Sequence, residues 1–118
     1  LAMRVAQERG SAIGQEIGYQ VRFENKSSQH TRIRYITDGL LLPKLLEDPE
    51  LTGVAAIVFD EFHERNLNSE LCLAHIIHNQ SIGIRCDLKL IVMSATLELS
   101  RLSNFLAPCT HLNADGRL

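Results

Sequence analysis

The sequence predicts an α/β domain with a mostly parallel sheet, on three observations. Residues 54–59 form a continuous apolar run, which is typical of a parallel strand covered on both faces. Residues 88–93 form a second, mainly apolar run, and a helical pattern over 67–78 separates the two. Because strands that alternate with helices indicate a parallel sheet, we expect the two runs to be neighbouring strands.

Shorter patterns predict the elements before residue 54. Residues 1–9 are rich in helix formers, and Gly10 after them is a typical C-terminal stop. Residues 19–23 alternate between apolar and polar side chains, which predicts a strand whose buried face carries Tyr19, Val21 and Phe23. Residues 32–36 predict a second such strand, whereas the polar, unpatterned residues 24–31 predict a surface loop.

Three further segments have helical patterns. Residues 40–46 look helical, but Pro43 removes a hydrogen bond in a helix interior, so we expect this helix to begin late or to kink. The next helix has the candidate caps Asn66 and Asn68 and an apolar face at helical spacing made of Leu67, Leu71, Ala74 and Ile77 or His78. A short helix over 101–106 and a last strand over 110–112 complete the prediction.

Length and composition limit the class of protein. The chain has 118 residues, of which 45% are hydrophobic and 22% charged, as expected of one globular domain. No apolar stretch approaches the roughly 20 residues needed to cross a bilayer, and the start lacks a secretory layout. We therefore expect a cytoplasmic protein with no membrane partner. Its three widely spaced cysteines form an odd set and predict reduced thiols.

The charge is divided unevenly along the chain. The net charge of −2 excludes a broadly basic nucleic-acid coat. Residues 1–46 carry seven Lys/Arg against four Asp/Glu, or +3, whereas residues 47–118 carry five against ten, or −5. A polyanion partner is therefore expected to meet the first part, and a metal cation the second.

Asp60 and Glu61 follow the apolar run 54–59 directly, at the strand end where open α/β sheets bind ligands. Phosphate-transfer enzymes use carboxylates in this position to hold a metal and activate water. Asp60 would bind Mg²⁺, through water, and Glu61 would accept a proton from the attacking water. The alternative is that both acids only cap the helix that follows.

Two zinc interpretations fail. His63 and Glu64 invite comparison with the H-E-x-x-H helix of zinc proteases, but Leu67 occupies the second histidine position. On the next helix, side chains three residues apart fan over about 120° and cannot all face one ion. A partly buried helix face better explains that group, which is Cys72, His75 and His78.

Hydroxyl and guanidinium groups are further candidates. Ser94 and Thr96 end the strand beside the acids, so their hydroxyls are placed to relay the state of a bound phosphate, although such residues often simply end a strand. Three arginines on the strand patterns are placed to contact nucleic-acid phosphates, namely Arg22, Arg32 and Arg34. Solvated strand faces carry arginines equally often, so both interpretations stay open.

Four segments together resemble the DEAH/DExH-box helicases of superfamily 2, in order and in spacing. They are residues 18–24 (GYQVRFE), 37–41 (TDGLL), 60–65 (DEFHER) and 94–97 (SATL). The resemblance covers essentially the whole chain. It implies the three-layer, RecA-like fold of the P-loop NTPases, as the first of two motor domains that use ATP to move along and unwind RNA or DNA.

The resemblance also implies a role for each matching residue. The residues expected to bind Mg²⁺, activate water and couple the nucleotide to neighbouring motifs are Asp60, Glu61 and His63. The motif that links hydrolysis to strand separation corresponds to Ser94 and Thr96. The motif that grips the nucleic-acid backbone corresponds to Thr37, Asp38 and Gly39, with Arg22 as a further candidate.

The chain departs from the family pattern at several points. Phe62 stands where the DEAH box has Ala, which resembles the bacterial HrpB-type branch, and Pro43 interrupts a helix. None of the seven glycines is followed by Lys, so residues 1–118 contain no G-x-x-x-x-G-K-[ST] phosphate loop. The second motor domain is absent from them too. We expect a partial domain, truncated at its N-terminus, that depends on flanking domains and alone neither binds ATP tightly nor hydrolyses it.

A rival hypothesis is a non-catalytic module, derived from a helicase, that binds nucleic acid or a protein through its basic first part. A flavodoxin-like fold fails because it requires a phosphate or flavin loop that the sequence lacks. Loss of the family's first strand would expose an unpaired sheet edge, so a homodimer of the chain is a further expectation.

Overall fold

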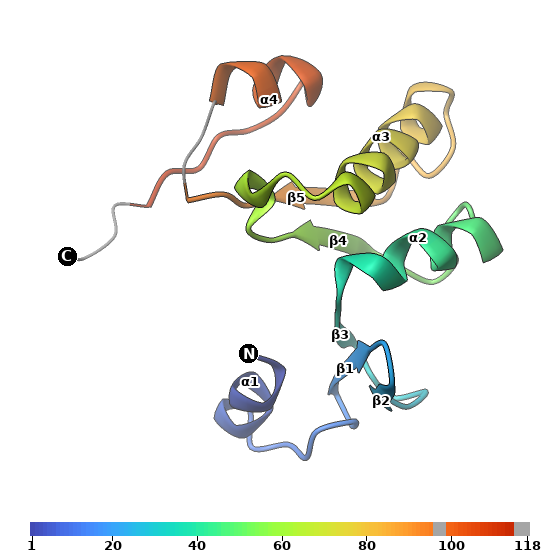
Figure 1. Cartoon of the computed structure of the whole chain (residues 1–118), viewed down its shortest axis with the longest axis vertical. Helices are drawn as coiled ribbons and strands as arrows, with labels where there is room; N and C mark the ends of the chain where they lie inside the picture. The colour runs from blue at the N-terminus through green and yellow to red at the C-terminus, as the bar shows by residue number, and fades with distance from the viewer. Residues whose placement is uncertain (96–98, 115–118) are drawn as a thin grey trace.

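The computed structural model describes the backbone of residues 1–95 and 99–114, and their side chains apart from those of 99–101 (Figure 1). The helices are α1 (Ala2–Glu8), α2 (Asp38–Glu47), α3 (Leu67–Ser81) and α4 (Leu99–Phe105), with one 3₁₀ helix, η1 (Phe62–Glu64). The strands are β1 (Ile17–Val21), β2 (Glu24–Lys26), β3 (Ile33–Ile36), β4 (Ala56–Phe59) and β5 (Lys89–Val92). No helix in these ranges is long and apolar enough to span a bilayer.

The strands form two small sheets that α2 connects along the chain (Figure 1). In the first sheet β1 lies in the middle, antiparallel to β2 and parallel to β3. In the second sheet β4 and β5 pair in parallel, with α3 as the crossover between them. The parallel β4–β5 pair with its helical crossover, and the further parallel pair β1–β3, confirm the predicted α/β class.

The turn between β1 and β2 corrects two expectations. Residues 24–26 form a strand on β1, so the loop predicted for 24–31 is wrong in its first part. Phe23 lies in the turn and is 91% exposed, outside the buried face that the alternation predicted. Alternation alone does not locate the end of a strand. The strands approach closely at Gly18, where a Cβ would lie only 2.5 Å from the carbonyl oxygen of Lys26.

α1 packs against β1 and ends where the sequence predicts. Ala2 and Ala6 contact the fully buried Ile17 of β1 in the smaller of two cores. Gly10 has φ 67°, a conformation that glycine adopts at little cost. The N–H groups of Gly10 and Ser11 donate to carbonyls of the last helical turn at 3.0 and 2.9 Å, which is the Schellman arrangement.

α2 begins earlier than expected. Thr37 is its N-cap, and the helix runs from Asp38 through Pro43 without interruption, so the predicted late start is wrong. Pro43 has no N–H to donate to the carbonyl of Gly39, four residues back. Packing outweighs this loss, because Leu45 on the same helix is 3% exposed in the larger core.

The larger core lies between α2, α3 and one face of the β4–β5 sheet. Its buried members are Leu45, Leu51, Phe59, Cys72, Leu73, Ile76 and Leu88. The other face of the sheet is open, because the opposed residues Val58 and Ile91 are 52% and 48% exposed. The prediction that this strand is covered on both faces is therefore wrong within the described residues. An apolar run indicates that both faces of a strand favour burial, and the segment that covers a face must come from elsewhere.

α3 buries a different face from the predicted one. Cys72, Leu73 and Ile76 are buried, whereas Leu67 and Leu71 of the predicted face are 68% and 48% exposed. The helix has two apolar stripes on opposite sides, and both satisfy helical spacing. Only contact with α2 and the sheet decides which stripe enters the core.

The C-terminal part keeps one of its two predicted elements. α4 begins at Leu99, two residues before the expected start. Residues 106–114, the part described after α4, contain no strand, so the strand predicted over 110–112 is wrong. Leu112 is 93% exposed, and it pairs with none of the strands that the structure describes.

Candidate functional site

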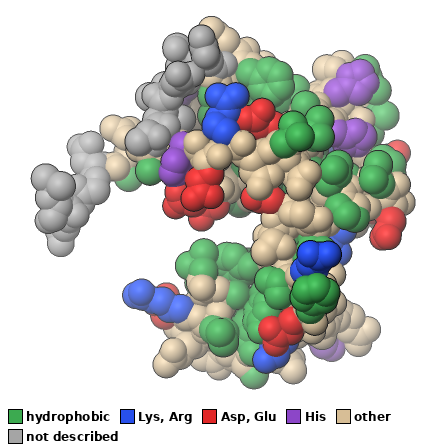
Figure 2. Space-filling model, viewed as in Figure 1, with side chains coloured by type: hydrophobic (Ala, Val, Ile, Leu, Met, Phe, Trp, Pro, Cys, Tyr) green, Lys and Arg blue, Asp and Glu red, His purple; other side chains and the backbone are tan. Residues whose placement is uncertain are grey.

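The acids and the serine lie at one edge of the β4–β5 sheet, as the sequence predicts. Phe59, the last residue of β4, pairs with Val92, the last residue of β5, so Asp60 and Ser94 follow strand ends that lie side by side. The N–H of Met93 donates to the carbonyl of Phe59 at 2.8 Å and extends the ladder by one bond. Figure 2 shows acidic side chains beside a histidine on the part of the surface where β4 ends.

Left-handed backbone conformations at two residues shape the loop after β4. Glu61 has φ 52° and Arg65 has φ 55°, on either side of η1. The carboxylate Oδ1 of Asp60 accepts the N–H of Glu61 at 2.9 Å. The N–H of Phe62 donates to the carbonyl of Met93 at 3.0 Å and so ties the loop to the end of β5.

The two acids do not cap the long helix that follows, so the capping alternative is wrong. The N-cap of α3 is Asn66, whose side chain accepts the N–H of Asn68 at 2.9 Å. Glu61 stands before η1, and its carboxylate makes no capping bond there. Neither carboxylate is therefore used to cap α3.

His63 connects the two strand ends. Its Nε2 lies 3.2 Å from Oε2 of Glu61, and its Nδ1 accepts the N–H of Ala95 at 3.3 Å. Its side chain is 27% exposed, so the imidazole is half-buried between the two strand ends. The Glu61 carboxylate is therefore connected through one side chain to the backbone of the segment after β5.

One member of the predicted hydroxyl pair lies within the described residues. Ser94 lies two residues after the end of β5, next to Ala95, whose N–H donates to the imidazole of His63. Thr96 lies outside the described residues. Within 1–95 and 99–114 no three His, Cys, Asp or Glu side chains gather into a group that could hold a metal ion.

The predicted nucleic-acid contacts lie on the other sheet, away from the acids. Gln20 pairs with Ile36 in parallel, so the residues after β1 and β3 reach the same edge. That edge therefore carries Arg22 beside the start of α2, where Thr37, Asp38 and Gly39 are all exposed. The sequence motif and Arg22 therefore lie at the same end of this sheet.

One exposed residue of this edge was missed by the sequence reasoning. The guanidinium of Arg22 lies 5.1 Å from the centre of the Phe23 ring, which is open to solvent. Such a pair offers a flat aromatic face and a positive charge together. The alternation of apolar residues at 19, 21 and 23 predicted that Phe23 is buried. Its exposure follows from the turn at residues 22–23, which the alternation does not indicate.

The chain is similar to known proteins along its whole length. No protein-family model matches it. It is 43% identical over 121 residues to the probable ATP-dependent RNA helicase DHX40 of Homo sapiens, and 43% identical over 117 residues to the probable ATP-dependent RNA helicase DHR2 of Saccharomyces cerevisiae. It is 39% identical over 117 residues to the ATP-dependent RNA helicase HrpB of Escherichia coli. These alignments cover 99–100% of the chain.

Solved structures give the same result. The crystal structure of the E. coli DExH-box NTPase HrpB superposes with a TM-score of 0.82 and 42% identity over 89% of this chain. This chain belongs to the DExH-box helicase family. Its fold is that of the family's RecA-like domain, as the resemblance implied.

The DExH-box segment is short compared with its relatives. It spans 14–16% of the length of the three curated proteins and 13% of the HrpB chain of known structure. The similar proteins come from human, yeast and a bacterium, so the likeness is not confined to the bacterial branch that Phe62 indicated.

Proposed function

We propose that this segment belongs to an ATP-dependent RNA helicase, in which Asp60, Glu61 and His63 serve nucleotide hydrolysis. The observation that carries the proposal is the bridge from the Glu61 carboxylate through His63 to the N–H of Ala95. It joins the ends of two parallel strands, where α/β proteins bind ligands. The names of the similar helicases support both the reaction and RNA as the substrate.

The donor chemistry at the end of β4 fits Mg²⁺. Asp60 is exposed, and only its Oδ1 accepts a hydrogen bond, from the N–H of Glu61. Mg²⁺ prefers oxygen ligands and often takes one or two protein carboxylates, with water and phosphate oxygens completing its shell. Asp60 would therefore hold the ion, through water. When bound, Mg²⁺ would neutralise charge on the phosphates of ATP.

Glu61 is the proposed general base, and His63 the residue that orients it. The Glu61 side chain is 59% exposed, so water has access to the carboxylate. A hydrogen bond from the imidazole of His63 restricts the rotation of that carboxylate. Because the same ring is held by Ala95, Ser94 and Thr96 are proposed to receive the signal that hydrolysis has occurred.

The edge formed by β1 and β3 is the proposed nucleic-acid contact. Arg22 supplies a positive charge, and the exposed residues Thr37, Asp38 and Gly39 form the N-cap and the first turn of α2. N–H groups in the first turn of a helix have no partner within the helix and are suited to phosphate oxygens. Phe23 adds an aromatic face on which a base can stack.

The 118-residue chain by itself is proposed to be inactive. Its sequence contains no phosphate loop, whose backbone amides and lysine provide most contacts to a triphosphate. Calorimetric titration of the chain with Mg-ATP is expected to give no binding in the micromolar range. A micromolar dissociation constant would refute this part of the proposal.

The proposed chemistry is tested by Glu61→Gln in the complete protein that contains this segment. The amide keeps the shape of the side chain but cannot accept a proton, so RNA-stimulated ATP hydrolysis should fall by about a thousandfold while ATP binding persists. Glu64→Gln is the matched control, because Glu64 is an exposed carboxylate in the same loop. Equal activity of Glu61→Gln and wild type would refute the role of Glu61.

A further inference from the structure

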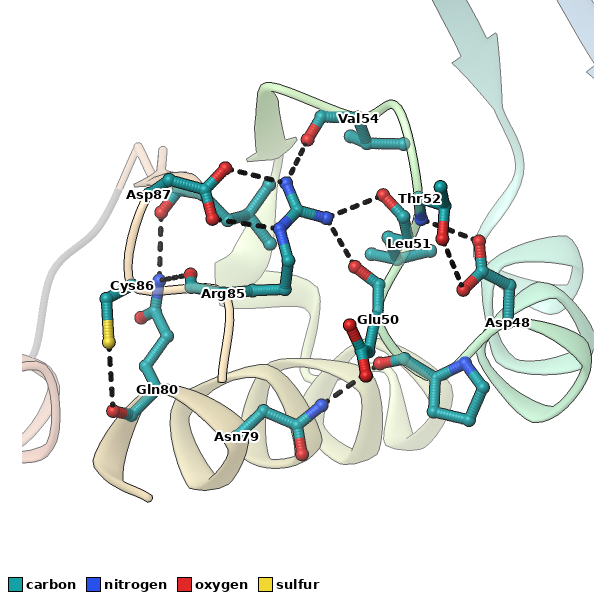
Figure 3. A network of polar contacts seen from close by, with 12 residues as sticks. Asp48, Glu50, Leu51, Thr52, Val54, Asn79, Gln80, Arg85, Cys86 and Asp87 are labelled. Carbon is teal, nitrogen blue, oxygen red and sulfur yellow. Dashed lines mark hydrogen bonds and ion pairs between the residues drawn. The ribbon is translucent and has the colours of Figure 1, made fainter. Parts of the chain in front are cut away.

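The guanidinium of Arg85 is fully occupied by hydrogen bonds (Figure 3). Its Nε and Nη2 donate to the two carboxylate oxygens of Asp87 at 2.9 and 3.1 Å. Its Nη1 donates to the carbonyls of Glu50 and Leu51, the second at 2.7 Å, and Nη2 also donates to the carbonyl of Val54 at 2.5 Å. A guanidinium has five N–H groups, and these five acceptors use all of them.

Three of these acceptors belong to the loop between α2 and β4, which has an uncommon backbone. Leu51 has φ 50° and Gly53 has φ 77°. The carboxylate of Asp48 accepts both the N–H and the hydroxyl of Thr52, at 2.6 and 3.2 Å, and Asn79 of α3 donates to a further loop carbonyl at 3.0 Å. The loop is thus held by side chains, and Arg85 makes more of these bonds than any other residue that Figure 3 labels.

This network closes one end of the β4–β5 ladder, and the acids lie at the other end. The carbonyl of Ala55, the residue after Val54, accepts the N–H of Lys89 at 3.0 Å and begins the ladder. At the far end the N–H of Met93 donates to the carbonyl of Phe59. Arg85 therefore ties together the two segments that enter the ladder, just before their first shared bond.

A ladder of four residue pairs contributes little stability, and a slip of one residue would turn each side chain to the opposite face. We infer that Arg85 is a positioning residue: by holding the α2–β4 loop against Asp87, it sets the register of β4 on β5 and thereby the position of Asp60 and Glu61. This inference rests on the proposed function, because the register matters to activity only if these acids act on a nucleotide.

Position 85 requires arginine rather than any cation. The acceptors surround the guanidinium: the Asp87 carboxylate lies on one side of the group, and the loop carbonyls lie on another (Figure 3). Lysine keeps the charge but has one nitrogen with three donors, so it cannot serve both sides. Arg85 itself has φ 54°, and the side-chain amide of Gln80 donates to its carbonyl at 3.3 Å, so the residue is fixed before it binds the loop.

The test is Arg85→Lys in the complete protein, measured by steady-state ATP hydrolysis and by hydrogen exchange with mass spectrometry. We expect kcat to fall about tenfold with KM within about threefold of wild type, because misplaced acids affect chemistry more than binding. Exchange should accelerate in peptides over 55–62 as well as in the loop 49–54. The control is Arg4→Lys, since Arg4 is exposed and pairs only with Glu8, four residues away.

A second variant decides the matter if Arg85→Lys does not fold. Asp87→Asn keeps the size of the side chain but weakens the pair that orients the guanidinium, so it should lower kcat and accelerate exchange over 55–62 by at least about threefold. The proposal is overturned if the variant that folds keeps both kcat and this exchange within about twofold of wild type. Glu61→Gln separates the two hypotheses, because an active Glu61→Gln enzyme would refute the proposed function, whatever Arg85 does.

Discussion

The imidazole of His63 donates a hydrogen bond to the carboxylate of Glu61 and accepts one from the N–H of Ala95. Nδ1 accepts the N–H of Ala95 at 3.3 Å, so the proton of a neutral ring lies on Nε2, which faces the Glu61 carboxylate at 3.2 Å. One side chain therefore connects the end of β4 to the residue after Ser94. This connection is the physical route by which hydrolysis would reach the neighbouring strand.

Removal of this imidazole is expected to separate hydrolysis from unwinding. His63→Ala in the complete protein should lower RNA unwinding at least about tenfold more than it lowers ATP hydrolysis, because Glu61 remains while its link to Ala95 is lost. Both rates are measured on the same preparation, by phosphate release and by strand displacement. His78→Ala is the control, as His78 is exposed on α3. Equal losses of the two rates would show that His63 has no part in coupling.

The buried face of α3 is tested by two leucines of the same helix. Leu73→Ala should lower the free energy of unfolding by about 2–5 kcal/mol, because Leu73 is 1% exposed and its removal leaves a cavity. Leu71→Ala should change it by only about 0.5 kcal/mol, because Leu71 is 48% exposed. Urea denaturation followed by circular dichroism gives both values. A larger loss for Leu71→Ala would mean that the exposed stripe is the core face after all.

The three thiols should differ in reactivity. Cys72 is fully buried, and burial, with a smaller contribution from the Asp38 carboxylate, raises the pKa of its thiol to about 11. Cys86 and Cys109 are exposed. A maleimide reagent at neutral pH should therefore label two thiols in the native chain and all three in denaturant, as counted by intact mass. Rapid labelling of Cys72 in the native chain would contradict the packing of α3.

The raised pKa of the Cys72 thiol predicts that the free energy of unfolding falls at alkaline pH. Its pKa is 9.0 when unfolded and about 11 when folded, so the native state keeps its proton over a range in which the unfolded state loses it. The stabilisation is complete below pH 9 and is lost as the pH rises towards 11. Cys72→Ala should flatten the fall of the free energy of unfolding over this range. An identical pH profile for the variant would argue against a raised pKa.

Protonation of Asp87 at low pH should weaken its hydrogen bonds with Arg85. The hydrogen bond from Arg85 lowers the pKa of the Asp87 carboxyl below its ordinary value of 3.8. Its contribution to stability is therefore complete above pH 3.8 and is lost as the pH falls through the lower, folded-state pKa. The difference in free energy of unfolding between wild type and Asp87→Asn should shrink over that range. A difference that stays constant with pH would mean that the carboxylate is not bound by Arg85.

The position of the acids could be predicted from sequence because it depends on short-range facts. An apolar run that ends at Phe59 fixes the strand end, and parallel pairing with the next run brings Ser94 to the same edge. The bridge through His63 could not be predicted in this way. It joins residues 32 apart and requires a left-handed conformation at Glu61, which no pattern of hydrophobicity indicates.

Packing faces were harder to predict than elements. The periodicity of α3 is satisfied by Leu67 and Leu71 as well as by Leu73 and Ile76, and only contact with α2 decides between them. The role of Arg85 had no local signal either, because the three loop carbonyls that it binds lie about 31–35 residues earlier in the chain. Residues that bind distant backbone carbonyls leave no periodic trace in a sequence.

The backbone at Glu61 places two separate demands on one position. With φ 52° and ψ 35°, it occupies a region that glycine and asparagine enter readily and that β-branched residues resist. A valine there would distort the turn even if no carboxylate were needed, whereas an asparagine would preserve the turn and remove the acid. Mutational scans at residue 61 will therefore report on conformation and on chemistry together, and only replacements matched in backbone preference will separate the two.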